Sequence, residues 1–247
     1  MTAIRIFHAS DLHFGEEDRD ALDWFAALVR DEQPDAVVIT GDITMHGSQR
    51  QFAAAEQWLS GLPAPLLLGI GNHDLPYYHH MIRRVLRPYA RYEALARAVE
   101  SEWKNDGVAL VPLCTIAPAQ WRLNWSKGVV SKLALAATIA RLSQVQSAAM
   151  KLVMAHHPLV ETGTRGTALT RGGDNALAAL ARAGVTAVLS GHVHDPFDLT
   201  YQSVAGPVRM IGAGTLSKRL RTTAPSFNEL VIAQSLTVNV RDYLPHS

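Results

Sequence analysis

Side chains that can bind metal ions occur in five short groups along this sequence: Asp11 and His13; Asp42; Asn72, His73 and Asp74; His156 and His157; and His192 and His194. Each group directly follows a short apolar run that reads as a buried strand. Imidazole, carboxylate and amide oxygen together suit Zn, Fe and Mn, whereas sites made of oxygen alone suit Ca or Mg. The sequence therefore indicates a transition-metal site, assembled from residues up to 183 positions apart.

Two of these groups place their ligands two residues apart. Asp11 and His13 follow the end of the first apolar run, and alternate residues of an extended chain point to the same side. We therefore expect both of these side chains to reach one ion. The same spacing separates His192 from His194, although two ions could also divide these histidines between them.

The five groups must be carried by strands that share one edge of a sheet. Short apolar runs bounded by turn residues predict strands at 4–9, 36–40, 65–70, 108–113, 151–155 and 185–190. Helical periodicity predicts helices at 18–31, 48–59, 131–150 and 174–183, the last two with Ser131 and Asp174 as N-caps. Because the carboxyl ends of parallel strands meet at one edge of an α/β sheet, we expect the groups to converge there.

After residue 190 the pattern changes from alternating strands and helices to strands alone. Strands are predicted at 199–204, 208–211, 228–233 and 236–242, with short turns between them. Such a change favours two packed sheets with helices outside. We therefore predict an α/β fold in a single domain over residues 1–247, a four-layer αββα sandwich of two mixed β-sheets flanked by helices.

For two stretches of this domain the sequence allows a more specific prediction. Residues 195–247 are predicted to be the β-rich C-terminal part of the second sheet. Residues 75–128 form the least regular stretch, which makes them a candidate cap or lid over the site. The same stretch is rich in aromatic residues and is therefore also a candidate surface for a homodimer.

Charge and composition exclude several classes of protein. Lys plus Arg is 23 and Asp plus Glu is 22, so no basic excess drives binding to nucleic acid or anionic membranes. The single cysteine, Cys114, excludes an internal disulfide framework and a metal site made of thiolates. The first residues lack the pattern of a signal peptide, and no apolar stretch is long enough to span a bilayer. We therefore expect a cytoplasmic protein.

The five groups also form a series of motifs: Asp11-x-His13, Gly41-Asp42, Gly71-Asn72-His73-Asp74, His156-x-Pro158 and Gly191-His192-x-His194. This series resembles the calcineurin-like metallophosphoesterase superfamily, with all five motifs intact. The resemblance covers residues 4–194 and extends through the predicted C-terminal strands. With Asp74, a short chain and no signal sequence, the protein is most similar to the bacterial branch that contains class III cyclic-nucleotide phosphodiesterases and glycerophosphodiesterases.

The resemblance implies a centre of two divalent or trivalent transition-metal ions, which could be Fe, Mn, Zn or Co. It also implies which residues bind them: Asp11, His13 and His194 the first ion, Asn72, His156 and His192 the second, and Asp42 both. His73 would be a catalytic residue outside the coordination sphere, with Asp74 fixing its tautomer or raising its basicity. His73 would then either donate a proton to the leaving alkoxide or orient the substrate.

The reaction implied by the resemblance is hydrolysis of a phosphodiester bond in a small-molecule substrate by a metal-bridging hydroxide. Alternatives with the same centre are a pyrophosphatase, a nucleotide-sugar hydrolase or a phosphomonoester hydrolase. A nuclease is disfavoured because the charge is balanced and no DNA-binding extension is evident, so we expect neither a nucleic-acid nor a membrane partner. A catalytically silent scaffold of the same fold is disfavoured because every ligand is present.

Overall fold

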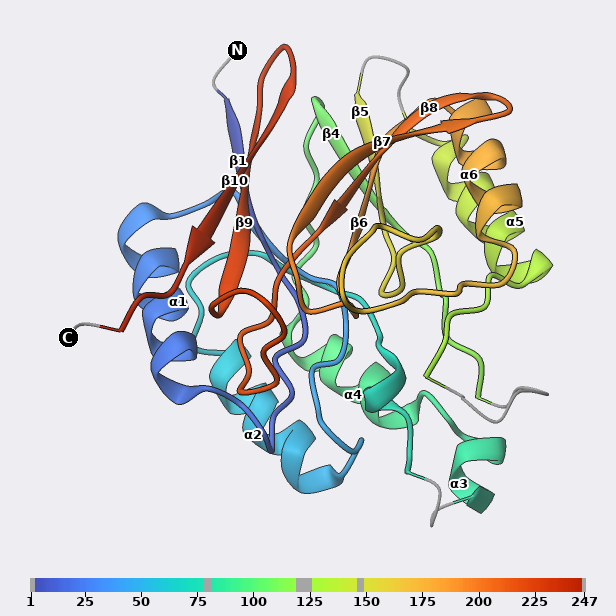
Figure 1. Ribbon diagram of the computed structural model, residues 1–247. Coiled ribbons are helices and arrows are strands. Elements are labelled where there is room, and N and C mark those ends of the chain that lie inside the picture. The colour runs from blue at the N-terminus through green and yellow to red at the C-terminus, as the bar shows by residue number, and fades with distance from the viewer. Residues whose placement is uncertain (1–2, 78–80, 119–125, 146–148, 246–247) are drawn as a thin grey trace.

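Figure 1 shows the computed structural model of the protein, which describes residues 3–77, 81–118, 126–145 and 149–245. Its strands are β1 (Ile4–Ala9), β2 (Ala36–Ile39), β3 (Leu66–Leu68), β4 (Val108–Pro112), β5 (Met150–Met154), β6 (Val185–Ser190), β7 (Phe197–Ser203), β8 (Gly206–Gly212), β9 (Ser226–Ile232) and β10 (Leu236–Asp242). They form two five-stranded sheets, in the orders β10-β9-β1-β2-β3 and β4-β5-β6-β8-β7. Each sheet combines parallel strands with antiparallel ones, β9 and β10 in the first and β7 in the second.

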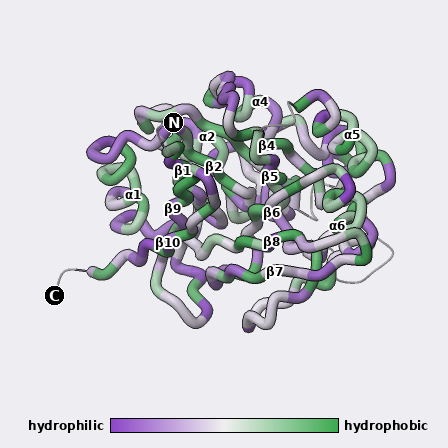
Figure 2. The backbone as a smooth tube through the Cα atoms, turned by 90° about the horizontal axis from the view of Figure 1, so that it is seen from above, coloured by the Kyte–Doolittle hydropathy of each residue, from purple (hydrophilic) through white to green (hydrophobic). Residues whose placement is uncertain are grey.

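Helices cover the outer face of each sheet. The helices are α1 (Arg19–Glu32), α2 (Gln49–Leu59), α3 (Met81–Leu86), α4 (Ala90–Val99), α5 (Lys132–Leu142) and α6 (Gly173–Arg182), with a short 3-10 turn, η1 (Asn72–Asp74). Helices α1 and α2 lie against the first sheet, and α5 and α6 lie against the second (Figures 1 and 2). None of the helices in the described ranges has the length and apolar character needed to cross a membrane.

Three apolar clusters separate four layers of structure, because each inner strand buries both of its faces. In β2, Val37 and Ile39 pack toward α1 and α2, whereas Ala36 and Val38 pack toward the second sheet. In the second sheet, Val153 packs toward α5 and α6, and its neighbours in β5 pack toward the first sheet. The alternation of side chains along a strand produces this division. The predicted four-layer αββα sandwich is therefore confirmed.

Side-chain caps explain where three of the helices begin. Asp18, Ser48 and Ser131 each accept a hydrogen bond from the backbone N–H three residues later, at the start of α1, α2 and α5. Two expectations about helix ends are wrong. Helix α5 ends at Leu142, not at residue 150, because β5 already begins there. Asp174 lies in the first turn of α6, where its charge complements the helix dipole, and Gly172 is the N-cap.

The C-terminal strands do not all belong to the second sheet, so the prediction for 195–247 is wrong in part. The hairpin β7-β8 joins the second sheet, where β8 pairs in parallel with β6. The hairpin β9-β10 crosses to the first sheet, where β9 pairs antiparallel with β1. Without β9, one edge of β1 would present unpaired backbone groups. The connection between the hairpins, residues 213–225, runs beside the candidate site described below.

The stretch 75–128 is only partly separate from the body of the protein. Leu95 on α4 is buried in the apolar cluster that also holds α2, and β4 is an edge strand of the second sheet. A cap or lid can therefore not include residues 90–112. Helix α3 lies away from the sheets in Figure 1.

Candidate metal centre

The five groups of polar residues meet where parallel strands of both sheets end. Backbone hydrogen bonds join their loops: Asp11 N–H donates to Gly41 O at 3.0 Å, His13 N–H donates to Asp42 O at 3.0 Å, and Gly191 N–H donates to His156 O at 3.0 Å. Two more hydrogen bonds join the loops of one sheet to those of the other, from His192 N–H to Asp11 Oδ2 and from His156 Nδ1 to Thr40 O, both at 2.8 Å. The structure therefore brings together residues from both sheets, as the strand-end argument predicts.

Five of the seven expected ligands have a left-handed backbone. Their φ angles lie between 46° and 69°, at Asp11, His13, Asp42, His192 and His194. This conformation costs a residue with a Cβ about 1–2 kcal/mol, and such strain gathers at functional sites. The expected reason for their convergence is wrong, because the strand has already ended at Ala9. Asp11 and His13 converge because both have a left-handed backbone, and not because alternate residues of an extended strand point to the same side.

Asp11, His13 and His194, which we call the aspartate cluster, place their ligand atoms together. Asp11 Oδ1 lies 3.1 Å from His194 Nε2 and 3.5 Å from His13 Nε2, and the two Nε2 atoms are 3.2 Å apart. All three residues are buried. Three buried donor atoms at such separations leave room at their centre for one ion.

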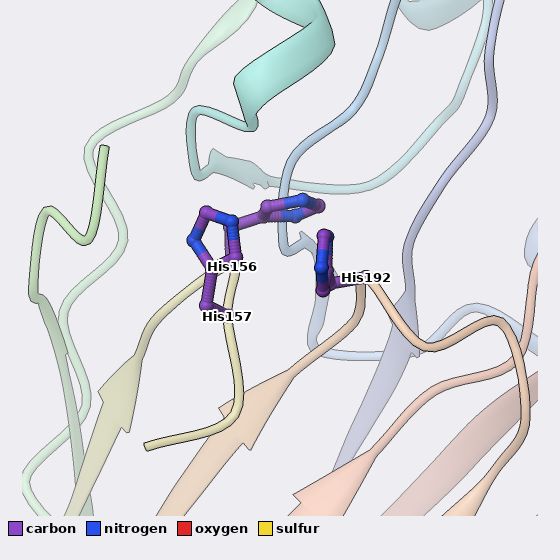
Figure 3. Close-up of side chains that lie close together, drawn as sticks. All are labelled: His156, His157 and His192. Carbon is purple, nitrogen blue, oxygen red and sulfur yellow. The ribbon is translucent and has the colours of Figure 1, made fainter. Parts of the chain in front are cut away.

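Asn72, His156 and His192, which we call the asparagine cluster, face the aspartate cluster. His156 Nε2 lies 3.2 Å from Asn72 Oδ1, and the rings of His156 and His192 are 5.2 Å apart between centroids. Figure 3 shows these two rings beside His157, whose centroid lies 4.4 Å from that of His192. His192 and His194 are thus divided between the two clusters, the second of the alternatives left open by their spacing.

Asp42 lies between the two clusters. Its Oδ2 atom is 3.3 Å from His156 Nε2 and 3.9 Å from His13 Nε2, and its Oδ1 atom accepts a hydrogen bond from His73 N–H at 2.8 Å. One carboxylate thus faces ligand atoms of both clusters, which is the geometry that a bridging ligand needs.

The protonation of the histidines fits metal binding. His156 Nδ1 donates to Thr40 O at 2.8 Å, and His194 Nδ1 donates to Arg219 O at 2.6 Å, so in both rings Nε2 is the nitrogen that faces the centre and is available to a metal ion. Asp11 Oδ1 is buried without a hydrogen-bond partner in the described part of the chain. Imidazole nitrogens and carboxylate oxygens that face one another in a buried site need a proton or a metal cation between them, and imidazole with carboxylate suits a transition metal.

Burial and charge set the pKa values of these groups. Burial lowers the pKa of His13 to about 4 and that of His192 well below its usual range, so both are neutral. Burial acts to raise the pKa of Asp42, but the charge of His156 holds it below its usual range. Burial acts to lower the pKa of His156, and the Asp42 carboxylate raises it to about 9. A metal ion at the asparagine cluster must therefore displace a proton from His156.

His73 lies at the front of the centre, on the turn η1. Its Nδ1 atom donates to Met45 O at 2.7 Å, and its Nε2 atom accepts from Arg219 Nη1 at 3.1 Å. Its ring meets that of His13 edge-on, with centroids 4.9 Å apart. The turn brings His73 beside the ligands while both of its ring nitrogens have other partners.

The expected contact between Asp74 and the His73 ring is absent, and this expectation is corrected. Asp74 Oδ1 accepts from the N–H and hydroxyl of Thr44 at 2.8 and 3.0 Å, and Oδ2 accepts from Gly71 N–H at 2.9 Å. Asp74 thus joins the loops that carry Asp42 and Asn72. The Met45 carbonyl, not Asp74, fixes the tautomer of His73. Burial and the neighbouring Asp42 charge raise the pKa of Asp74 to about 7.

His157 packs behind the asparagine cluster with both ring nitrogens engaged. Its Nε2 atom donates to Ser126 O at 2.8 Å, and its Nδ1 atom lies 2.9 Å from the Thr115 hydroxyl. Burial lowers the pKa of His157 to about 3, so the ring is neutral. With no lone pair directed at the centre, His157 supports the asparagine cluster and does not complete it.

A cavity of about 320 Å³ opens in front of the two clusters. It is lined by Asp42, Asn72, His73, Ser126, Lys127, Arg165, Gly166, Thr167, His192, His194, Arg219 and Arg221. The four cationic residues of this wall have no counterpart among the sequence motifs. Two of them, Arg219 and Arg221, follow Thr215, which donates its hydroxyl to Asp11 O at 2.6 Å and so ties this segment to the aspartate cluster.

Comparisons with known proteins agree with this geometry. A family model described as calcineurin-like phosphoesterase matches residues 4–196. A glycerophosphodiester phosphodiesterase, GpdQ, of Enterobacter lignolyticus is 51% identical over 43 residues, which are 17% of this chain and 16% of that protein. The chain thus matches only about a sixth of the length of this curated relative.

Solved structures share the fold at low sequence identity. A dimetal phosphatase from Danio rerio is similar with a TM-score of 0.67 and 14% identity, over 97% of this chain and 96% of that one. A purple acid phosphatase from yellow lupin is similar with a TM-score of 0.67 and 15% identity, over 98% of this chain and 52% of that one. At such identity these likenesses concern the fold alone.

Proposed function

The chain belongs to the calcineurin-like phosphoesterase family, and we propose that it hydrolyses a phosphodiester bond in a small molecule. The position of Asp42 carries this proposal, because its Oδ2 atom lies 3.3 Å from His156 Nε2 and 3.9 Å from His13 Nε2. One carboxylate can then hold two ions. Two bound ions, of Fe, Mn, Zn or Co, would polarise the phosphoryl oxygens and supply a bridging hydroxide as nucleophile.

The residues in front of the clusters would act on the substrate. His73 Nδ1 is held by Met45 O, so Nε2 is the nitrogen that would face the leaving alkoxide; it accepts from Arg219 in the structure, and it could donate a proton only after Arg219 has moved to the substrate and Nε2 has taken up that proton. Arg219 Nη1, 3.1 Å from that nitrogen, would bind a phosphoryl oxygen and place the leaving group beside His73. Asp74 would act through the loops that it joins, as a positioning residue.

The size of the cavity and the local relative favour a small diester. A volume of about 320 Å³ suits a small molecule. The 43-residue match to a protein named as a glycerophosphodiesterase supports a diester as substrate. Hydrolysis of a phosphomonoester is the second candidate, because the cationic wall of the cavity suits a dianion. A homodimer and a cytoplasmic location stay predictions.

The test is a screen of metal-free protein reconstituted with Mn, Fe, Zn or Co. Substrates are bis(p-nitrophenyl) phosphate, p-nitrophenyl phosphate, glycerophosphodiesters, 3′,5′-cyclic AMP and nucleotide diphosphate sugars. We expect metal-dependent turnover with kcat/KM highest for a diester. A preference for p-nitrophenyl phosphate would support the monoester alternative, and no turnover with any metal would favour a silent scaffold.

A further inference from the structure

Four cationic side chains from three separate segments line the cavity. They are Lys127, Arg165, Arg219 and Arg221. Asp42 is the single carboxylate among the described residues that line it, and Asp42 faces the metal clusters. The wall in front of the clusters is therefore strongly positive even before any metal ion is counted.

The segment that carries Arg219 and Arg221 is fixed to the loop of the last ligand. His194 Nδ1 donates to Arg219 O at 2.6 Å. The next residue, Asp195, accepts from the N–H and hydroxyl of Thr222 at 2.9 and 2.6 Å through one carboxylate oxygen. Two neighbouring residues of the ligand loop thus hold the backbone on both sides of Arg221.

The segment that carries Arg165 is fixed to the other side of the same loop. Gly166 packs so closely on Val193 that a Cβ at this position would lie 2.9 Å from Val193 Cα, which only glycine avoids. Lys127 Nζ donates to the carbonyl and hydroxyl oxygens of Thr167 at 2.6 and 2.7 Å. The backbone beside Arg165 is therefore fixed next to the ligand loop, and Arg165 lines the same cavity as Arg221.

Some arginines of the protein are held in ion pairs, but Arg165 and Arg221 are not among them. Arg5 and Arg241 share the carboxylates of Glu32 and Glu229, and Arg209 pairs with Asp198. Within the described ranges, Arg165 and Arg221 have no carboxylate within 4.0 Å, and both are exposed. Two exposed guanidinium groups that line a cavity without a carboxylate beside them raise the local concentration of anions and favour an anionic ligand.

We propose that the substrate carries a second anionic group, a carboxylate or a further phosphate, besides the phosphodiester that is cleaved. Arg165 and Arg221 bind this group at the mouth of the cavity, while Arg219 contacts the phosphoryl group beside His73. A guanidinium matches both anions, since its planar fork of donors pairs with two oxygens. The proposal rests on the proposed function and excludes diesters with choline or other cationic head groups as the preferred substrates.

The kinetic test uses a matched series of p-nitrophenyl phosphodiesters and the metal-loaded protein. The second ester group is a short chain that ends in a phosphate, a carboxylate, a methyl group or a trimethylammonium group, so that the leaving group stays constant. We expect kcat/KM to be roughly tenfold higher for both anionic chains than for the methyl chain, and lowest for the cationic chain. The ratio of kcat/KM between the substrate with the phosphate chain and the substrate with the carboxylate chain shows which anion is preferred.

The variant Arg165→Gln/Arg221→Gln tests the assigned residues. The preference for the anionic over the methyl chain should fall from roughly tenfold to about one. Arg182→Gln is the matched control, because Arg182 is an exposed arginine at the end of α6, away from the cavity, and it should keep the full preference. A preference that survives in the double variant would overturn the assignment.

A binding measurement keeps the inference separate from catalysis. Calorimetry with non-hydrolysable phosphonate analogues of the carboxylate and methyl substrates should show a Kd roughly tenfold lower for the carboxylate, and equal Kd values in the double variant. Equal hydrolysis and equal binding of the anionic and methyl compounds would overturn this inference and leave the proposed function intact. If none of the four diesters is hydrolysed, the proposed function fails and the inference falls with it.

Discussion

The aspartate cluster and the asparagine cluster offer the same number of side chains but not the same charge. The aspartate cluster contains the carboxylate of Asp11, whereas the asparagine cluster has the neutral amide of Asn72 in its place. Both share Asp42. Two unit charges about 4 Å apart attract by ~4 kcal/mol at an effective dielectric constant of 20, and a divalent ion is attracted more strongly.

From this difference we expect the ion at the aspartate cluster to be held more firmly than the ion at the asparagine cluster. The aspartate cluster provides two carboxylates for its ion, and the asparagine cluster provides one. The clusters are still joined, because Asp11 Oδ2 accepts a hydrogen bond from His192 N–H at 2.8 Å. Occupation of one cluster therefore affects the backbone of the other.

The largest effect is expected from Asp42→Asn, because this change removes the charge that both clusters share. We expect fewer than two metal ions per chain and a fall in kcat/KM for bis(p-nitrophenyl) phosphate of about 10³-fold, equivalent to ~4 kcal/mol. Metal analysis and steady-state kinetics measure both. Asp106→Asn is the matched control, because Asp106 is exposed and lies just before the second sheet begins. This variant should keep two metal ions per chain and normal turnover. If Asp42→Asn kept two metal ions per chain and normal turnover, Asp42 would not be a ligand that both clusters share.

The charge difference between the clusters should appear as two steps of metal release. Dialysis of the loaded protein against increasing chelator should remove one ion well before the other, with activity lost in the first step. In Asp11→Asn the two steps should merge, because each cluster then depends on Asp42 alone. Metal content measured against chelator concentration tests this, and a single step in the wild type would contradict it.

His73→Ala should separate catalysis from metal binding. Because both ring nitrogens have partners outside the clusters, metal content should stay near two per chain. Turnover of a diester with an alkoxide leaving group should fall by about 10²-fold, since that group needs a proton, and p-nitrophenyl esters should lose much less. Equal losses on the two substrates would refute proton donation by His73. Loss of metal would make it a ligand.

The smallest effect is expected from His157→Gln, which removes the ring that supports His192. Affinity for the more weakly held ion should fall by about tenfold, with the firmly held ion unchanged. Thr115→Val, which removes the hydroxyl partner of His157 and keeps the ring, should show a smaller change of the same kind. Titration of metal into metal-free protein measures both affinities. If both clusters lost metal affinity equally, the substitution would have destabilised the whole centre, and His157 would have no specific role in supporting the asparagine cluster.

Much of the architecture could be predicted because the strands are short apolar runs that end at polar residues. The runs before Asp11, Asp42 and His192 locate the edge of the sheets at which these side chains meet. The sheet membership of β9 and β10 could not be predicted, because strand periodicity carries no information about which edge a hairpin joins.

The details of the site depend on the backbone, which the sequence pattern does not encode. The left-handed turns at Asp11 and His13 and the partners of Asp74 arise from contacts between loops of different strands. Arg165 and Arg221 lie in irregular segments without periodicity or motif, and only packing against the ligand loop brings them to the cavity. The residues that meet at the edge of the sheets were therefore accessible from the sequence, whereas the cationic wall of the cavity was not.

The most direct test of a shared carboxylate between two unequal clusters is a crystal structure of the metal-loaded protein with anomalous diffraction data. It should show two metal peaks about 3.5–4 Å apart, with the Asp42 carboxylate in contact with both. The peak between Asp11, His13 and His194 should have the higher occupancy. A single peak, or two peaks of which Asp42 contacts only one, would contradict the account.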